Sequence, residues 1–117
     1  MNNRSFKEDL TALLTVVEEV PKRLVFTSYV TKEMENTPVE DFVETTRSRN
    51  VLHRGHINTA KDLYEKWDTL LKIRGGGEKC VKEIKNGYLE WYYSQLEGNE
   101  IKKYWEEFIE ANDLVVM

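Results

Sequence analysis

The sequence predicts an all-α fold, a small bundle of five or six short helices. Three observations support this: apolar residues recur at helical spacing, helix start signals precede these stretches, and glycine or proline follows them. A length of 117 residues suits one domain, so we expect residues 1–117 to form a single helical domain. Hydrophobic residues make up 40% of the chain and charged residues 32%, a composition that excludes a disordered chain.

The first predicted helix begins at Ser5 and ends near Pro21. Ser5 and Glu8 fit a capping box, in which the hydroxyl and the carboxylate each accept a hydrogen bond from a free backbone N–H group. One helical stripe then contains the apolar residues Phe6, Leu10, Leu13, Leu14 and Val17.

Residues 22–30 are compatible with two structures. Their β-branched and aromatic side chains favour a strand, whose partner would be the tail. This alternative is a short two-stranded β element from residues 23–30 and 114–116. Pro21 could instead begin a helix in which Phe26, Val30 and Met34 align. We favour the helix.

The rest of the chain contains the remaining predicted helices. Start signals at residues 37–40 predict a helix that runs to about Leu52 and ends near Gly55. The next starts near Asn58 or Thr59, with Asp62 as a capping partner, and ends at the three glycines 75–77. Residues 81–92 keep helical spacing, but the turn signal Asn86-Gly87 interrupts them, so two short helices or one kinked helix could form. The last helix follows residues 98–99.

The middle of the chain is basic, and residues 46–61 contain no acidic residue. A cluster of cations is what contact with nucleic-acid phosphates requires. This hypothesis gives a nucleic-acid-binding protein, and its candidate residues are Arg47, Arg49, Arg54, Lys61, Arg74 and Lys79. The basic segment could equally face the acidic parts of its own fold.

Arg47 and His53 are separated by five residues. This spacing resembles the Arg-x(4–6)-His motif of HEPN-type ribonucleases. The resemblance implies cleavage of RNA without a metal ion, in which His53 acts as acid or base and Arg47 holds the phosphate.

The C-terminal third combines many large aromatic residues with acidic ones. Tyr92 and Tyr93 are adjacent, so we expect at least one of them to reach the surface. Tyrosine and tryptophan are common in protein interfaces. The candidate partner-binding residues are Tyr92, Tyr93, Glu97, Glu106, Glu107 and Glu110. Our leading hypothesis is therefore a small non-enzymatic regulator, adaptor or inhibitor that binds another protein, in the style of a bacterial or phage accessory protein.

The sequence predicts neither a cofactor nor a metal ion. His53 and His56 are three residues apart but lack a third ligand nearby, and Cys80 is the only cysteine. No apolar run approaches the roughly 20 residues of a membrane helix, so we expect a cytoplasmic protein without a membrane partner. A protein partner is expected, and nucleic acid or a second copy of the chain are alternatives.

Overall fold

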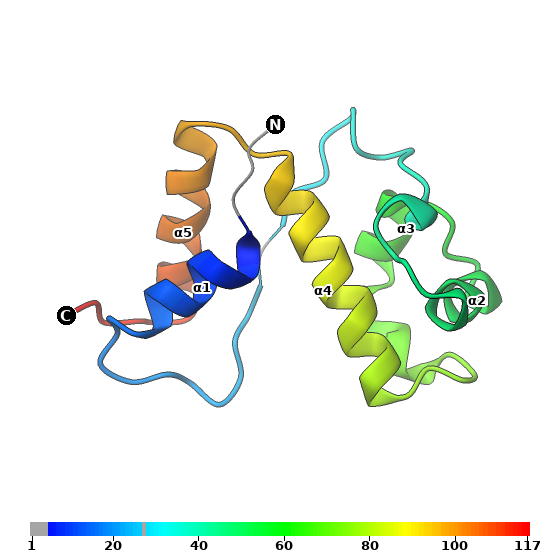
Figure 1. Cartoon of the computed structure of the whole chain (residues 1–117), viewed down its shortest axis with the longest axis horizontal. Coiled ribbons are helices and arrows are strands. Elements are labelled where there is room, and N and C mark those ends of the chain that lie inside the picture. Colours follow the sequence, from blue (N-terminus) through cyan, green and yellow to red (C-terminus); the bar gives the residue numbers. More distant parts are fainter. Residues whose placement is uncertain (1–4, 27) are drawn as a thin grey trace. The chain divides into compact units, whose positions relative to one another are not determined.

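The computed structural model describes residues 5–26 and 28–117. Within these residues the chain forms five α-helices and two short 3-10 helices (Figure 1). In chain order they are α1 (Phe6–Leu14), η1 (Val39–Asp41), α2 (Thr46–Arg54), α3 (Ala60–Glu65), η2 (Trp67–Lys72), α4 (Glu78–Ser94) and α5 (Asn99–Ala111). The predicted all-α class is confirmed.

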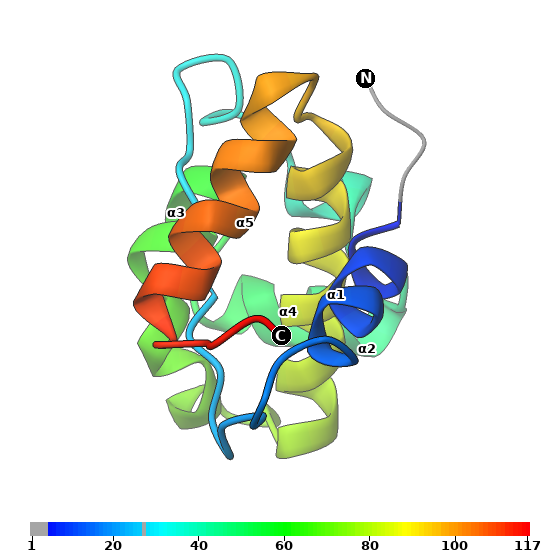
Figure 2. The ribbon, with the colours of Figure 1, turned by 90° about the vertical axis from the view of Figure 1, so that its left-hand side faces the viewer.

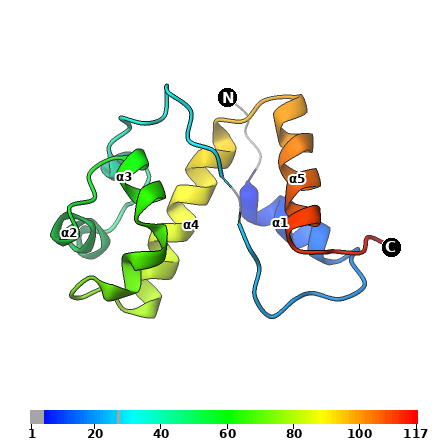
Figure 3. The same cartoon turned by 180° about the vertical axis from the view of Figure 1, so that it is seen from behind.

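The chain divides into two compact units. Unit 1 comprises residues up to Ser28 and from Glu90 onward, and unit 2 comprises Tyr29–Leu89. Unit 1 thus combines α1, α5 and the end of α4, whereas unit 2 contains η1, α2, α3, η2 and the rest of α4 (Figure 3). That the whole chain forms one domain stays a prediction.

Helix α1 begins as predicted and ends earlier. The Ser5 hydroxyl accepts a hydrogen bond from the Glu8 N–H, but Glu90 of α4 takes the other capping role. The Glu90 carboxylate accepts hydrogen bonds from the N–H groups of Phe6 (3.0 Å) and Lys7 (2.8 Å). The helix ends at Leu14, not near Pro21, because residues 16–18 form a strand-like contact instead.

That contact is an antiparallel bridge between Val17 and Val116. The Glu18 N–H donates to the Val115 carbonyl, and the Met117 N–H donates to the Val16 carbonyl. The C-terminal segment therefore runs beside the segment that follows α1 (Figure 2). The tail does pair with the N-terminal part of the chain, but its partner is Val17 and not the predicted residues 23–30.

Residues 22–30 contain neither the favoured helix nor a strand wherever they are described. Asn112 binds the backbone near their centre. Its side-chain amide oxygen accepts from the Val25 N–H (2.6 Å), and its side-chain nitrogen donates to the Val25 carbonyl (2.9 Å). One side chain thus occupies both backbone groups of Val25, which leaves them unavailable to a helix or a sheet.

The predicted helix from Pro38 to Leu52 is in fact two elements. The start signal opens only η1, and α2 begins later with Thr45 as its N-cap, whose side chain accepts from the Ser48 N–H. The C-cap of α2 is Gly55, as predicted. Arg49 stabilises the intervening turn, because its guanidinium donates to the carbonyls of Val43 (2.6 Å) and Glu40 (3.0 Å).

Helix α4 is continuous through Asn86-Gly87, where a break was also considered. The glycine at this position permits a close approach. A Cβ on Gly87 would lie 2.4 Å from the Phe42 carbonyl oxygen, so only glycine lets the turn after η1 contact α4 here.

Each unit has its own core. In unit 1 aromatic rings pack edge to face or stacked around Phe6, which lies 5.6 Å from the rings of Tyr93 and Trp105. In unit 2 the buried side chains include Leu52, Leu63, Leu70, Ile84 and Tyr88.

No helix in the described part of the chain is long and apolar enough to cross a membrane.

The capping box of α3 forms as predicted, with Thr59 and Asp62 as its two members. The Asp62 carboxylate accepts hydrogen bonds from the N–H groups of Asn58 (3.0 Å) and Thr59 (3.2 Å). These bonds, the one from Asn58 first, hold the pKa of Asp62 below its ordinary value.

We expect Asp62→Ala to lower the free energy of unfolding by about 0.5–2 kcal/mol at pH 7. A depressed pKa means that the charged carboxylate stabilises the fold above its ordinary pKa of about 3.9, and that this contribution is lost as pH falls through the lower folded value. Urea denaturation at neutral and acidic pH measures the difference in free energy of unfolding between the unmodified chain and Asp62→Ala. This difference should become smaller as the pH drops below about 4. An equal difference at all pH values would contradict the capping role, and the exposed Asp68→Ala is the control.

Candidate functional site: the exposed face of α2

Helix α2 presents a cationic face. Arg47, Asn50 and Arg54 lie at positions i, i+3 and i+7, and all three are exposed. This spacing puts them on one side of a helix, while Ser48 and Leu52 lie toward the opposite side and are buried. The helix contains no acidic residue, so nothing within it neutralises its arginines.

Hydrogen bonds attach the start of α2 to the start of α4. Glu83 of α4 accepts from the Thr45 hydroxyl (2.5 Å) and from the Ser48 hydroxyl (3.0 Å). The Ser48 hydroxyl also lies 3.3 Å from the Cys80 sulfur. Ser48 is buried, so this contact holds Arg47 beside the first turn of α4. That turn carries the exposed Lys79.

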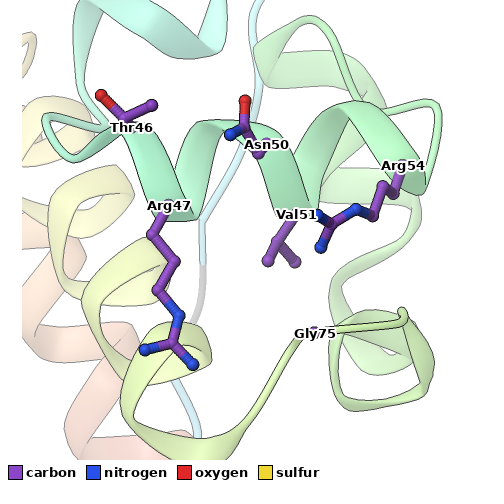
Figure 4. Close-up of a pocket in the computed structure, with 6 residues that line it drawn as sticks. All are labelled: Thr46, Arg47, Asn50, Val51, Arg54 and Gly75. Atoms are coloured by element: carbon purple, nitrogen blue, oxygen red, sulfur yellow. The ribbon is translucent and has the colours of Figure 1, made fainter.

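A shallow pocket of about 470 Å³ lies along this face. Figure 4 shows side chains of α2 along one edge of it and the turn at Gly75 across from them. Gly75 has a φ of +85°, and a Cβ there would lie 2.6 Å from a terminal nitrogen of Arg54. Arg54 itself donates to the Arg74 carbonyl (3.2 Å). The lining residues are Thr46, Arg47, Asn50, Val51, Arg54 and Gly75.

The predicted nucleic-acid residues separate into two groups. Arg47, Arg54, Arg74 and Lys79 lie on α2, in the turn before α4 or in the first turn of α4. Arg49 instead binds backbone carbonyls, and Lys61 on α3 forms an ion pair with Glu35 at 3.8 Å.

Sequence reasoning missed Thr46 and Asn50, which the pocket adds. A helical-periodicity test centred on Arg47 would have found Asn50, since it lies between the two arginines on their face.

The ribonuclease-like pair is not assembled. Arg47 lines the pocket, whereas the His53 Nε2 lies 2.8 Å from a carboxylate oxygen of Glu40, away from the pocket-lining residues. The pKa of Glu40 is below its ordinary value, first through a hydrogen bond from its own backbone N–H and then through His53. Six helical steps put Arg47 and His53 on different sides of α2, so one substrate phosphate would not contact both.

Only the acidic residues of the predicted partner-binding surface are exposed. Tyr92 and Tyr93 are both buried, so the expectation that one of them reaches the surface is wrong. The Tyr93 hydroxyl donates to Asp9 (2.5 Å) and accepts from the Trp105 indole nitrogen (2.8 Å), because α1 and α5 pack on either side of it. The acidic residues Glu97, Glu106, Glu107 and Glu110 are exposed.

Among the described residues, no group of three histidine, cysteine or acidic side chains is arranged to hold a metal ion.

Residues 28–88 match the family of the C-terminal domain of the bacterial RNA polymerase alpha chain. The match covers more than half of the chain and nearly coincides with unit 2. The chain belongs to this family. It is also 38% identical over 74 residues to the DNA-directed RNA polymerase subunit alpha of Mesoplasma florum. That alignment covers 62% of this chain and 23% of the relative, so the chain spans about a quarter of the relative's length. No solved structure matches it.

Family membership corrects the leading hypothesis. A regulator, adaptor or inhibitor in the style of a phage or bacterial accessory protein is wrong, because the matching family is a domain of a polymerase chain. The non-enzymatic assignment is wrong for the same reason, since this family forms part of an enzyme. The nucleic-acid alternative agrees better with the match.

Proposed function

We propose that this protein is a DNA-binding component of a bacterial RNA polymerase and that it contacts DNA through the cationic face of α2. The observation that carries the proposal is the alignment of Arg47, Asn50 and Arg54 on one exposed face without an acidic neighbour in the helix. Family membership and the DNA-directed relative favour DNA as the ligand.

The chemistry of this face suits a phosphate backbone. Arginine guanidinium groups donate several hydrogen bonds in a planar array that matches phosphate oxygens. The Asn50 amide can donate and accept, and therefore can contact either a phosphate or a base edge. Lys79 adds a charge at the start of α4, where free backbone N–H groups also favour anions.

The predicted partners follow from the same assignment. DNA is the nucleic-acid partner, and the other polymerase chains are the protein partners. The protein would then work in the bacterial cytoplasm, as the sequence also predicted.

The proposal is tested by titrating the full chain into a fluorescent DNA duplex and measuring anisotropy at several salt concentrations. Each neutralised phosphate releases counterions, so log affinity should fall linearly with log salt, with a slope of about −0.9 for each phosphate contacted. Absence of binding at about 50 mM salt, or an affinity that salt does not change, would overturn the proposal.

A further inference from the structure

The C-terminal end of α2 packs closely against the glycine turn that precedes α4. Gly75 in this turn has a φ of +85°, a backbone conformation that favours glycine. A Cβ on Gly75 would lie 2.6 Å from a terminal nitrogen of Arg54 and 3.7 Å from a methyl carbon of Val51. The Arg54 guanidinium therefore fills the space that a side chain at Gly75 would occupy.

A hydrogen bond holds the Arg54 guanidinium in this position. Its terminal nitrogen donates to the Arg74 carbonyl oxygen at 3.2 Å. The bond uses one of the five N–H donors of a guanidinium, and Arg54 remains exposed and lines the pocket on α2. Figure 4 shows its side chain on the side of α2 that faces the turn at Gly75. The fold thus orients the remaining donors of Arg54 at the pocket.

A guanidinium that the fold already orients is well suited to bind an anion. An arginine side chain loses conformational freedom when a ligand orders it, and this loss lowers the affinity. The bond to the Arg74 carbonyl brings part of that ordering before a ligand arrives. Arg54 also begins about 10 Å from Arg47 along α2, since each of the seven residues adds about 1.5 Å. The two arginines are therefore suited to different phosphates of one DNA backbone.

We propose that Arg54, the Arg74 carbonyl and Gly75 form a turn subsite that binds one phosphate of DNA, separate from the phosphate at Arg47. Arg54 contacts the phosphate. The Arg74 carbonyl orients the guanidinium, and Gly75 is a positioning residue because it leaves the space for it. Since the phosphate belongs to DNA, the turn subsite rests on the function proposed above for α2. It adds that the contact at Arg54 depends on a glycine and a backbone carbonyl as well as on charge.

The first test replaces Arg54 and measures the anisotropy of a fluorescent DNA duplex titrated with the full chain at several salt concentrations. Arg54→Ala should lower the affinity about tenfold at about 0.1 M salt and make the salt slope shallower by about one unit. Arg54→Lys keeps the charge but lacks the planar array that can bind a carbonyl and a phosphate together. It should therefore keep the salt slope and still lose about three- to tenfold in affinity. An Arg54→Lys variant that binds as tightly as the unmodified chain would overturn the proposal.

The second test adds a Cβ to the turn. Gly75→Ala should displace the Arg54 guanidinium and lower the affinity about as much as Arg54→Ala does. In a chain that already carries Arg54→Ala, the same change should alter the affinity by less than about twofold, because both substitutions remove one contact. Equal losses from Gly75→Ala in both chains would overturn the positioning role of Gly75.

Gly98→Ala is the matched control for backbone strain. Gly98 also has a positive φ, +52°, but it lies in unit 1, and a Cβ there would meet nothing in the described part of the chain within 4 Å. This variant should bind DNA within about twofold of the unmodified chain. Circular dichroism checks that each variant keeps its helices, and Arg54→Lys alone decides the proposal if Gly75→Ala does not.

The turn subsite and the DNA-binding function fail in distinguishable ways. An unmodified chain that does not bind the duplex overturns both. Binding that Arg47→Ala weakens, and that Arg54→Ala and Gly75→Ala leave within about twofold, overturns the turn subsite alone.

Discussion

Replacing Arg47 and Lys79 together with alanine should lower the affinity for duplex DNA on the order of 10- to 100-fold at about 0.1 M salt. Both side chains are exposed, and the Ser48 and Glu83 hydrogen bonds hold their helices side by side. The loss should be similar for different DNA sequences, because a phosphate contact carries no sequence information. The salt slope should become shallower by about two units, one for each lost phosphate contact.

The measurement is the same anisotropy titration, with Lys102→Ala/Lys103→Ala as the control. These two lysines are also exposed but lie on α5 in unit 1, where they pair with Glu106 and Glu107. The control should leave the affinity within about twofold. If both double variants reduced binding equally, the attraction would be a general charge effect, and α2 would not be the binding face.

Phe108→Ala should lower the free energy of unfolding by about 3–5 kcal/mol. The side chain is completely buried in unit 1. Its ring lies 5.6 Å from the ring of Phe26 and 5.4 Å from that of Trp105, so truncation leaves a cavity among aromatic rings. Such rings are too large to close the space by small movements.

Urea denaturation followed by tryptophan fluorescence measures this loss. Leu71→Ala is the control, since Leu71 is 60% exposed and its truncation should cost less than about 0.5 kcal/mol. A loss below about 1 kcal/mol for Phe108→Ala would show that the aromatic cluster is not the core of unit 1.

Local signals in the sequence determined the helix starts. Ser5, Thr59 and Gly98 open or precede helices as predicted, because a cap depends on residues within one turn of it. The apolar periodicity likewise identified the all-α class. The basic character of the segment that forms α2 was also evident from composition alone.

Tertiary contacts decided what local patterns left open. Residues 22–30 have ambiguous propensities, and Asn112, 87 positions beyond Val25, occupies both backbone groups of Val25. Asn86-Gly87 is a turn signal in the sequence, but Gly87 lies inside α4. There the Phe42 carbonyl approaches too closely for a residue with a Cβ. Asn112 and Phe42 are both distant in sequence from the residues they contact, so local patterns could not predict either contact.

Identifying the candidate site required both the local sequence pattern and the tertiary contacts. The sequence located the cations, but only the fold separated Arg47, which is free to face a ligand, from Arg49, whose donors are used by Val43 and Glu40. The aromatic residues followed the same logic, since Tyr92 and Tyr93 are both buried once α1 and α5 pack against α4. The sequence determines the type of each side chain. Whether that side chain can contact a ligand depends on which distant groups already bind or cover it.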